Sequence, residues 1–294
     1  IRTVRNPELL KKSTLYVSLE PCSHYGKTPP CAQLIIEKQI PRVVIGCADP
    51  FKEVSGRGIR MLREAGIEVK VGVLEQECRE LNRFFITAQE KHRPYVLLKW
   101  AQSADGFLDR RRSPGERPAV ISNEVTKAFV HRLRAETDAV LVGTNTALLD
   151  NPSLTVRDWC GRNPLRLFVD KELKTPASFH LLSDPVKTVV FTCREKEKEI
   201  YAEYVTLPCT DPKSMLNELS RRNIRSVMVE GGSRLLQSFI DSDYWDRVRV
   251  ECGEDRFGDG VVAPRFRGIL TESKKYGGSL VLTYDNPYPH PIID

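Results

Sequence analysis

The stretch Thr14–Ile36, TLYVSLEPCSHYGKTPPCAQLII, joins a strand pattern to a helix pattern through a loop that carries two cysteines. Thr14–Leu19 is β-branched and apolar enough for a buried strand. Pro29 and Pro30 then open a helix, because proline is tolerated in the first helical turn. A strand followed directly by a helix predicts the first unit of an α/β fold.

The same alternation continues along the chain. Further strands of the front part are predicted at 42–47 and 68–73. The helix between them ends at Gly66, which suits a C-terminal cap. Residues 75–90 form one amphipathic helix pattern, and Pro94 stops it. We therefore expect a domain boundary here, with residues 1–92 forming one α/β domain and 93–294 a second.

The rear part repeats the alternation with longer gaps. Strands are predicted at 95–101, 139–143, 165–170, 187–192 and 226–230, and helices at 122–136 and 233–240. Two last apolar segments, 247–251 and 279–284, are typical of antiparallel strands that close a sheet. We expect two α/β units, each built on a largely parallel sheet.

Composition narrows the class of protein. The chain has 294 residues, of which 40% are hydrophobic and 29% charged, as in globular proteins. No apolar run approaches the roughly 18 residues that a bilayer crossing needs. The net charge of +6 is too small an excess for a protein that binds nucleic acid, and it suits one that binds an anionic small molecule. The cluster Arg110–Arg112 is interpreted as a solvated turn.

The cysteines predict no disulfide framework, because most of the eight are scattered singly. We therefore expect a reducing, cytoplasmic setting. Cys22 and Cys31 differ, because they share one loop that ends at a helix start, where a thiolate is favoured. Two such thiolates could hold zinc, or they could be unlinked cysteines in a turn. His24 could ligate as well, but it more often hydrogen-bonds a substrate or the backbone.

The stretch Glu20–Cys31, with Pro-Cys-Ser-His and Thr-Pro-Pro-Cys, resembles the zinc deaminase half of the bifunctional riboflavin-biosynthesis deaminase/reductases, which have a cytidine-deaminase-like α/β/α fold. The resemblance implies that Cys22 and Cys31 are zinc ligands. It places His24 and Lys27 on the substrate side, with Lys27 a partner for a phosphorylated ribose. A zinc-bound water would then attack the amino-bearing carbon.

The family takes its third zinc ligand and its catalytic glutamate from a His-Ala-Glu element upstream of the cysteine loop, and these 294 residues contain none. We expect the element to lie before Ile1 in a longer polypeptide; the alternative is a truncated first domain without activity. As it stands, the chain is expected to bind zinc weakly or not at all and to retain only the reductase.

The resemblance continues beyond Pro94, where Leu98–Lys99 and Ser103–Gly106 look like the opening strand and loop of the dihydrofolate-reductase-like half. Lys99 ends a strand in an apolar stretch, so it needs a partner or a ligand. Without the resemblance, a surface lysine with a buried stem is an equal interpretation.

Two further segments could bind a nucleotide. Val142–Arg157 is a strand, a small-residue turn and a return segment that ends in arginine, although Asp-Asn-Pro is also an ordinary turn. Val229–Leu235 delivers two glycines into a helix start, where backbone N–H groups can approach a pyrophosphate. A mere tight turn is the alternative there.

The resemblance assigns roles to these segments. The residues implied to face the substrate are Arg134, Leu154, Arg157 and Glu230. Those implied to contact the cofactor are Gln102, Thr146, Asp150, Lys171, Gly231, Gly232, Ser233, Arg234 and Leu235. We take Lys99, Asp150 and Glu230 as the catalytic candidates.

This chain departs from the family at two places. Pro118–Ile121 stands where many members have Ser-x-Trp-Ile, so an aromatic stacking surface for the cofactor is missing. Lys171 follows Asp170 where a small polar residue is common, and it could select a 2′-phosphate.

Together these patterns predict a two-step enzyme. A zinc deaminase would act on a phosphoribosylaminopyrimidine, and a reductase would convert its ribosyl chain to ribityl with NADPH. We expect a homodimer, a phosphorylated pyrimidine as substrate, and neither nucleic acid nor a membrane as partner. The alternatives are a nucleic-acid-editing deaminase and a non-catalytic zinc-stabilised binding module.

Overall fold

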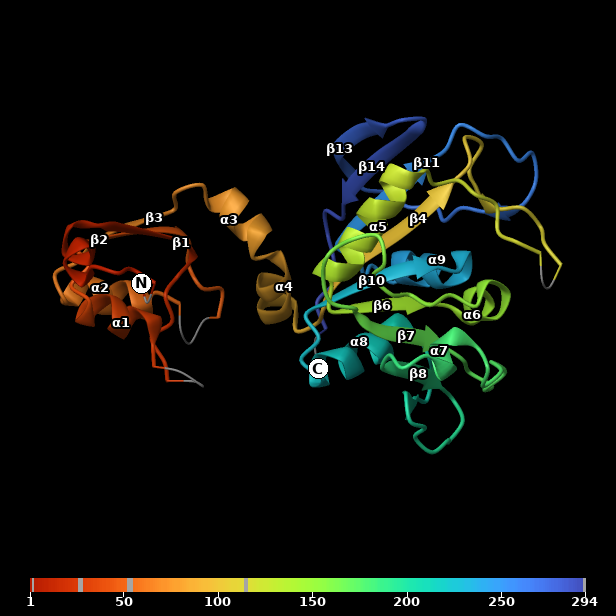
Figure 1. Ribbon diagram of the computed structural model, residues 1–294, viewed down its shortest axis with the longest axis horizontal. Coiled ribbons are helices and arrows are strands. Elements are labelled where there is room, and N and C mark those ends of the chain that lie inside the picture. Colours follow the sequence, from red (N-terminus) through yellow and green to blue (C-terminus); the bar gives the residue numbers. More distant parts are fainter. Residues whose placement is uncertain (2, 26–28, 52–54, 114–115, 293–294) are drawn as a thin grey trace. The chain divides into compact units, whose positions relative to one another are not determined.

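The structure is a computed structural model that describes residues 1, 3–25, 29–51, 55–113 and 116–292. It divides into two compact units, Ile1–Glu90 and Lys91–Asp294 (Figure 1). Among the described residues, none of the helices combines the length and the apolarity that a bilayer crossing requires.

Unit 1, residues 1–90, is built on a three-stranded parallel sheet in the order β1-β2-β3. The strands are β1 (Thr14–Leu19), β2 (Arg42–Cys47) and β3 (Glu68–Val71), and the helical elements are η1 (Pro7–Lys12), α1 (Cys31–Glu37), α2 (Arg57–Glu64), α3 (Glu75–Leu81) and α4 (Arg83–Lys91). Ile35, Ile45 and Leu62 pack between sheet and helices with at most 2% exposure, so α1 and α2 cover one face of the sheet. Gly66 follows α2 at φ +78°, as a C-terminal cap requires.

The single helix expected over 75–90 is wrong, because two helices occupy this stretch. α3 ends at Leu81, and the side-chain amide of the capping residue Asn82 donates to the carbonyl oxygen of Cys78 at 2.8 Å. An asparagine that bonds the backbone in this way competes with the regular helix ladder.

Unit 2 is built on a nine-stranded sheet in the order β13-β14-β11-β4-β10-β6-β7-β8-β9. Its strands are β4 (Tyr95–Gln102), β6 (Ala139–Val142), β7 (Leu165–Val169), β8 (Thr188–Thr192), β9 (Ala202–Thr206), β10 (Ser226–Gly231), β11 (Arg247–Cys252), β13 (Ile269–Tyr276) and β14 (Ser279–Asp285). From β11 to β9 all neighbours are parallel, whereas β14 pairs antiparallel with both β11 and β13. The predicted parallel sheet with an antiparallel close is therefore confirmed.

The helices of this unit follow the strands and cover the sheet (Figure 1). They are α5 (Glu124–Glu136), α6 (Thr144–Asp150), α7 (His180–Ser183), α8 (Pro212–Arg221) and α9 (Ser233–Asp241), and a small pair, β5 (Phe107–Asp109) with β12 (Val261–Val262), stands apart from the main sheet. Central strands such as β6 are buried along their whole length, as parallel strands between helix layers are. In such sheets, ligands bind at the carboxyl ends of the strands.

A buried ion pair anchors the start of this unit. The Arg93 guanidinium, 0% exposed, contacts Asp246 at 2.6 Å, and Lys91 contacts the same carboxylate at 2.7 Å. The backbone N–H of Val96 donates to it as well, at 2.8 Å. Burial alone would raise the pKa of Asp246, but Arg93 and Lys91 outweigh it and hold the pKa below its usual value.

Candidate active site

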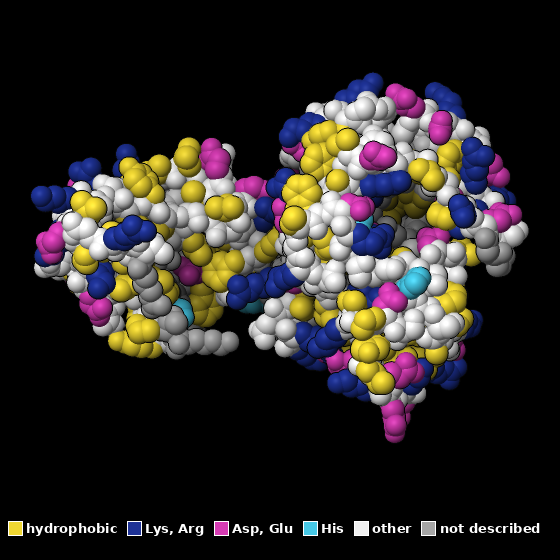
Figure 2. All heavy atoms as spheres, in the orientation of Figure 1, with side chains coloured by type: hydrophobic (Ala, Val, Ile, Leu, Met, Phe, Trp, Pro, Cys, Tyr) yellow, Lys and Arg dark blue, Asp and Glu magenta, His cyan; other side chains and the backbone are white. Residues whose placement is uncertain are grey.

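A cleft of about 1300 Å³ opens in unit 2, at the carboxyl ends of β4 and β10. Figure 2 shows it as a hollow in the larger unit, with basic, acidic and histidine side chains around it. The helix starts of α6 and α9, one side of α5 and the segment 118–122 complete its wall. The cleft therefore gathers residues from segments that are far apart in the chain.

Lys99 and Glu230 form the polar centre of this cleft. They are neighbours on adjacent parallel strands, since Val229 of β10 pairs with Leu98 of β4. Arg134 on α5 holds Glu230 through two hydrogen bonds, of 2.6 and 2.7 Å, with both side chains about nine-tenths buried. This pairing is bidentate, the strongest arrangement for arginine and a carboxylate.

The electrostatics differ between the two central groups. Burial would raise the pKa of Glu230, but Arg134 and then Lys99 lower it, so the group is a carboxylate at neutral pH. Burial lowers the pKa of Lys99, and the carboxylates of Glu230 and Glu251 partly offset this. No hydrogen bond joins the Lys99 ammonium to another described residue, which leaves it available to a ligand.

The turn after β10 fits a pyrophosphate. β10 ends at Gly231, Gly232 has φ +82°, and α9 begins at Ser233. A Cβ at either glycine would lie 3.4 Å from the Thr146 hydroxyl oxygen, so a side chain there would fill the space between this turn and α6. The bare backbone keeps a cradle open at a helix N-terminus, where an anion is stabilised.

Most of the other residues predicted for the site also line this cleft, and two do not. Besides those above, Asp150, Arg157, Lys171, Arg234 and Leu235 line the cleft. Gln102 and Leu154 are not among its described lining residues: the Gln102 side chain accepts from the Trp100 indole at 2.8 Å, and Leu154 is 3% exposed. Their assignment stays a prediction.

Arg112 is a site residue that sequence reasoning missed. Its side chain is 8% exposed and binds Asp109 and Asp150, each at 2.5 Å, so the solvated-turn interpretation is wrong for this member of the cluster. Asp150 ends α6 and is thus tied to the segment after β5. The residues that bind each other here are 38 positions apart, and no local pattern signals such a pair.

Two more residues of the cleft escaped the sequence patterns. His131 is 5% exposed on α5 and accepts the backbone N–H of Arg157 at 3.1 Å. Ser122 donates to the buried Glu251 at 2.7 Å, and the second oxygen of Glu251 has no partner among the described residues. The only sequence signal for such residues is a polar side chain at a position of a helix or strand that becomes buried.

The predicted zinc site in unit 1 is incomplete. Cys22 and Cys31 lie together, since the backbone N–H of Cys31 donates to the Cys22 sulfur at 3.2 Å. Within the described part of the chain, no group of three or more histidine, cysteine, aspartate or glutamate side chains could hold a metal. His24 is exposed, and Lys27 lies outside the described residues. Two sulfurs do not fit a catalytic zinc ion, which needs three protein ligands.

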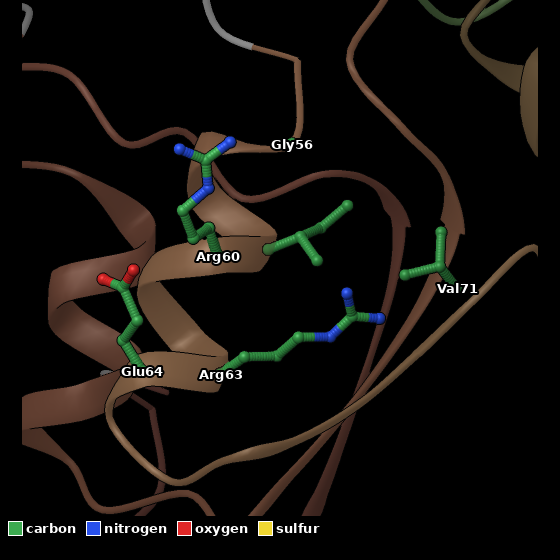
Figure 3. Close-up of a pocket in the computed structure, with 6 residues that line it drawn as sticks. Gly56, Arg60, Arg63, Glu64 and Val71 are labelled. Atoms are coloured by element: carbon green, nitrogen blue, oxygen red, sulfur yellow. The ribbon is translucent and has the colours of Figure 1, made fainter.

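Glu20, between β1 and the cysteines, has a structural role. Its carboxylate is 5% exposed and accepts four backbone N–H groups, those of Asp49, Gly56, Gly58 and Ile59, at 2.9 to 3.2 Å. It therefore fixes the entry into α2 rather than facing a substrate. A separate shallow cavity of about 470 Å³ lies beside α2 and includes Arg60, Arg63 and Val71 (Figure 3), but neither cysteine lines it.

Comparison with known proteins decides the family. Residues 94–263 match the family described as the RibD C-terminal domain, and residues 1–47 match the cytidine and deoxycytidylate deaminase zinc-binding region. The chain belongs to the RibD family. The predicted fold class, a partial cytidine-deaminase-like domain followed by a reductase domain, is thereby confirmed.

Individual relatives cover most of the chain. The riboflavin biosynthesis protein RibD of Aquifex aeolicus is 42% identical over 261 residues, which are 86% of this chain and 72% of that protein. RibD of Actinobacillus pleuropneumoniae is 38% identical over 95% of this chain and 74% of its own.

Among solved structures, a diaminohydroxyphosphoribosylaminopyrimidine deaminase/5-amino-6-(5-phosphoribosylamino)uracil reductase of Thermotoga maritima has a TM-score of 0.84 at 37% identity and covers 92% of this chain and 79% of its own. Acinetobacter baumannii RibD has a TM-score of 0.85 at 28% identity, over 95% of this chain and 82% of its own.

Proposed function

We propose that the cleft of unit 2 reduces the ribosyl group of a phosphorylated aminopyrimidine to ribityl with NADPH. The observation that carries this proposal is the Lys99–Glu230 pair beside the Gly231–Gly232 turn. It puts two charged groups next to a cradle for a dinucleotide in one cleft. The Thermotoga maritima relative is named as a reductase for 5-amino-6-(5-phosphoribosylamino)uracil, which identifies the substrate to test.

The cofactor would lie along the start of α9. The backbone from Gly231 to Leu235 would hold the pyrophosphate, and Thr146 would contact the nucleotide. Lys171 is exposed at the rim of the same cleft, where an ammonium suits a 2′-phosphate. Bound NADPH supplies the hydride for C1 of the opened sugar.

The protein's own side chains would orient the substrate by accepting hydrogen bonds from it and donating hydrogen bonds to it. Glu230, held as a carboxylate by Arg134, would accept a hydrogen bond from a substrate N–H or hydroxyl group. The Lys99 ammonium, on a partly buried side chain of the cleft, would donate to a substrate oxygen or nitrogen. Asp150, bound to Arg112, would act by holding the segment after β5 against α6. Catalysis would then rest on orientation and electrostatics.

The deaminase step of the family has no counterpart among the described residues of unit 1. The donors around Cys22 and Cys31 do not complete a catalytic zinc site, so no step is assigned to them. Family membership and the cleft in residues 91–294 favour the reductase over a nucleic-acid-editing deaminase and over a binding module without activity. The homodimer and the cytoplasmic location stay predictions.

The test is an assay of the full chain with NADPH and 5-amino-6-(5-phosphoribosylamino)uracil. We expect NADPH oxidation that depends on this substrate and that saturates with it. Glu230→Gln should lower kcat/KM by about a hundredfold, because a neutral amide no longer pairs with Arg134. Glu136→Gln, on the exposed face of α5, is the matched control and should leave it unchanged. Oxidation that is independent of the substrate, or absent, would overturn the proposal.

A further inference from the structure

We propose that His131 is a positioning residue that holds Arg157 in place to bind the substrate's phosphate. The inference rests on the proposed function, since it assigns the phosphate end of the same cleft. His131 and Arg157 both line this cleft, and neither lies in the turn that would hold the cofactor. His131 acts through Arg157 and is not required to touch the substrate.

The imidazole bridges two successive residues of the chain. Its Nδ1 accepts the backbone N–H of Arg157 at 3.1 Å, and its Nε2 lies 3.2 Å from a carboxylate oxygen of Asp158. Because Nδ1 is an acceptor here, the neutral ring carries its proton on Nε2 and donates it to Asp158. This arrangement uses both nitrogens of a ring that is 5% exposed.

The segment that carries Arg157 depends on such ties. Residues 151–157 belong to no helix or strand, so no hydrogen-bond ladder fixes their course. α5 holds this segment at two places: Arg134 donates to the carbonyl oxygen of Thr155 at 3.1 Å, and His131 holds Arg157 and Asp158. Without the His131 tie, the nearest anchors left to the Arg157 backbone are the Val156 N–H, which donates to the Asn163 side chain at 2.8 Å, and the Thr155 carbonyl oxygen, which accepts from Arg134.

Two arginines, Arg134 and Arg157, are implied to face the substrate, and of these only Arg157 has a guanidinium free for a phosphate among the described residues. Arg134 spends its donors on both oxygens of Glu230 and on the Thr155 carbonyl. The Arg157 guanidinium makes one long contact, 3.4 Å to the Thr155 hydroxyl. An arginine can bind a phosphate through two parallel N–H bonds, provided that its position is fixed.

The charges around His131 favour the neutral ring. Burial lowers its pKa first, and Arg134 on α5 and Arg157 on the segment lower it further, while Asp158 and Glu230 on β10 raise it. Protonation would put a second N–H on Nδ1, facing the N–H of Arg157, and would break the tie. Because the His131 pKa lies below the ordinary histidine value of about 6.5, we expect phosphate affinity to hold at that pH and to fall as the pH drops through the lowered pKa.

The experiment compares variants that each keep one of the two contacts. His131→Asn leaves an oxygen near the position of Nδ1, so it can still accept from Arg157, whereas His131→Gln reaches only toward Asp158. The first readout is calorimetric binding of ribose 5-phosphate to the full chain. We expect about a tenfold loss of affinity for His131→Gln, the equivalent of one hydrogen bond, and a loss below about threefold for His131→Asn.

A double-mutant cycle tests whether His131 acts through Arg157. In an Arg157→Gln background, His131→Gln should have no further effect on ribose 5-phosphate affinity. The second readout is KM, which should rise for the phosphorylated substrate but not for its dephosphorylated form, with kcat unchanged within about threefold. NADPH affinity, unchanged in every variant, would show that the fold is intact.

The outcomes separate the two proposals. Equal ribose 5-phosphate affinity in the wild type and His131→Gln, additive effects with Arg157→Gln, or no binding by the wild type would each overturn the role of His131. Absence of substrate-dependent NADPH oxidation in the wild type would overturn the reductase instead, whatever the binding data show.

Discussion

Units 1 and 2 each place functional residues where a strand leads into a helix, but only unit 2 surrounds them with further polar groups. In unit 1, Cys22 follows β1 and Cys31 begins α1; in unit 2, β10 ends with Glu230 and Gly231, and Gly232 joins it to α9. The cysteines find no further described ligand, whereas β4, α5 and α6 bring charged and hydroxyl groups to the second turn. A strand-to-helix turn therefore becomes a site only when other elements supply the rest of its chemistry.

Zinc binding gives the largest expected contrast between the units. After exposure to zinc and exhaustive dialysis, this chain should retain far less than one zinc ion, because two thiolates are one ligand short of a catalytic site. Elemental analysis measures this, with Cys22→Ser/Cys31→Ser as the control that should retain as little. A tightly held equivalent of zinc that the double variant loses would show that unit 1 is complete.

The next contrast is in the free energy of unfolding, which depends on a buried ion pair in unit 2 and hardly on an exposed one in unit 1. Asp246→Asn should lower the free energy of unfolding of unit 2 by about 3–5 kcal/mol, because Arg93 is left buried without its counter-charge. The three tryptophans, Trp100, Trp159 and Trp245, all lie in unit 2, so their fluorescence in urea reports on this unit. Glu68→Gln, which removes an exposed pair in unit 1, should leave that transition in place.

The same ion pair gives a pH dependence. The folded pKa of Asp246 is depressed, so its contribution is fully present above the unfolded value of about 3.9 and is lost as the pH falls through the folded pKa. The difference in stability between the wild type and Asp246→Asn should therefore shrink in acid. A difference that stays constant from neutral pH to strong acid would contradict the assigned role.

Removing the central ammonium should affect catalysis alone. Lys99→Met is expected to lower kcat by about a hundredfold, because Arg134, the other cation beside Glu230, already donates to Glu230 and Thr155 and cannot replace the Lys99 ammonium as a donor to the substrate. Lys127→Met is the matched control, since Lys127 is an exposed lysine of the same cleft. If both variants lose activity equally, general electrostatics would account for the result and Lys99 would have no special role.

A smaller effect, on the choice between NADPH and NADH, is expected from the residue assigned to the 2′-phosphate of NADPH. Lys171→Ala should weaken NADPH binding by about fivefold and leave NADH binding unchanged, because an exposed ammonium contributes about 1 kcal/mol to a phosphate. Fluorescence titration with both nucleotides measures the ratio. Lys174→Ala tests whether any nearby lysine would serve, and an identical ratio in the wild type and Lys171→Ala would remove the selectivity assigned to Lys171.

The smallest effect concerns the missing aromatic. Val120 lines the cleft, and its side chain is 72% exposed. Val120→Trp should tighten NADPH binding by about three- to tenfold, the amount that an aromatic stacking contact contributes. Val120→Leu adds apolar surface without a ring and should gain less. Equal gains from both would assign the effect to burial alone.

Much of the fold was predictable because its strands are buried and parallel. The predicted strands at 14–19 and 42–47 coincide with β1 and β2. β2 is buried from Val43 to Cys47, as a parallel strand under helices is, whereas no residue of β1 is buried, so the burial expected for β1 is wrong. β13, with the sequence ILTESKKY, was missed because an exposed edge strand carries charges on both faces. α6 was expected as part of a loop, since its sequence TNTALLD has no start signal beyond Gly143.

The site was predictable only where it is local in sequence. The Glu230–Leu235 turn is one such motif, and the structure places it in the cleft. The pairings of His131 with Arg157, 26 residues apart, and of Ser122 with Glu251, 129 apart, arise from the packing of α5 and its approach segment. Tertiary packing brings these partners together, so the spacing of residues in the sequence does not predict them.

The most direct measurement is a crystal structure of this chain grown with 5-amino-6-(5-phosphoribosylamino)uracil and the oxidised cofactor NADP⁺, which cannot reduce it. We predict the pyrophosphate over Gly231 and Gly232, the pyrimidine sugar beside Lys99 and Glu230, and the substrate's phosphate on Arg157. Both compounds bound elsewhere, or a cleft closed by the protein's own side chains, would contradict the proposed reductase site.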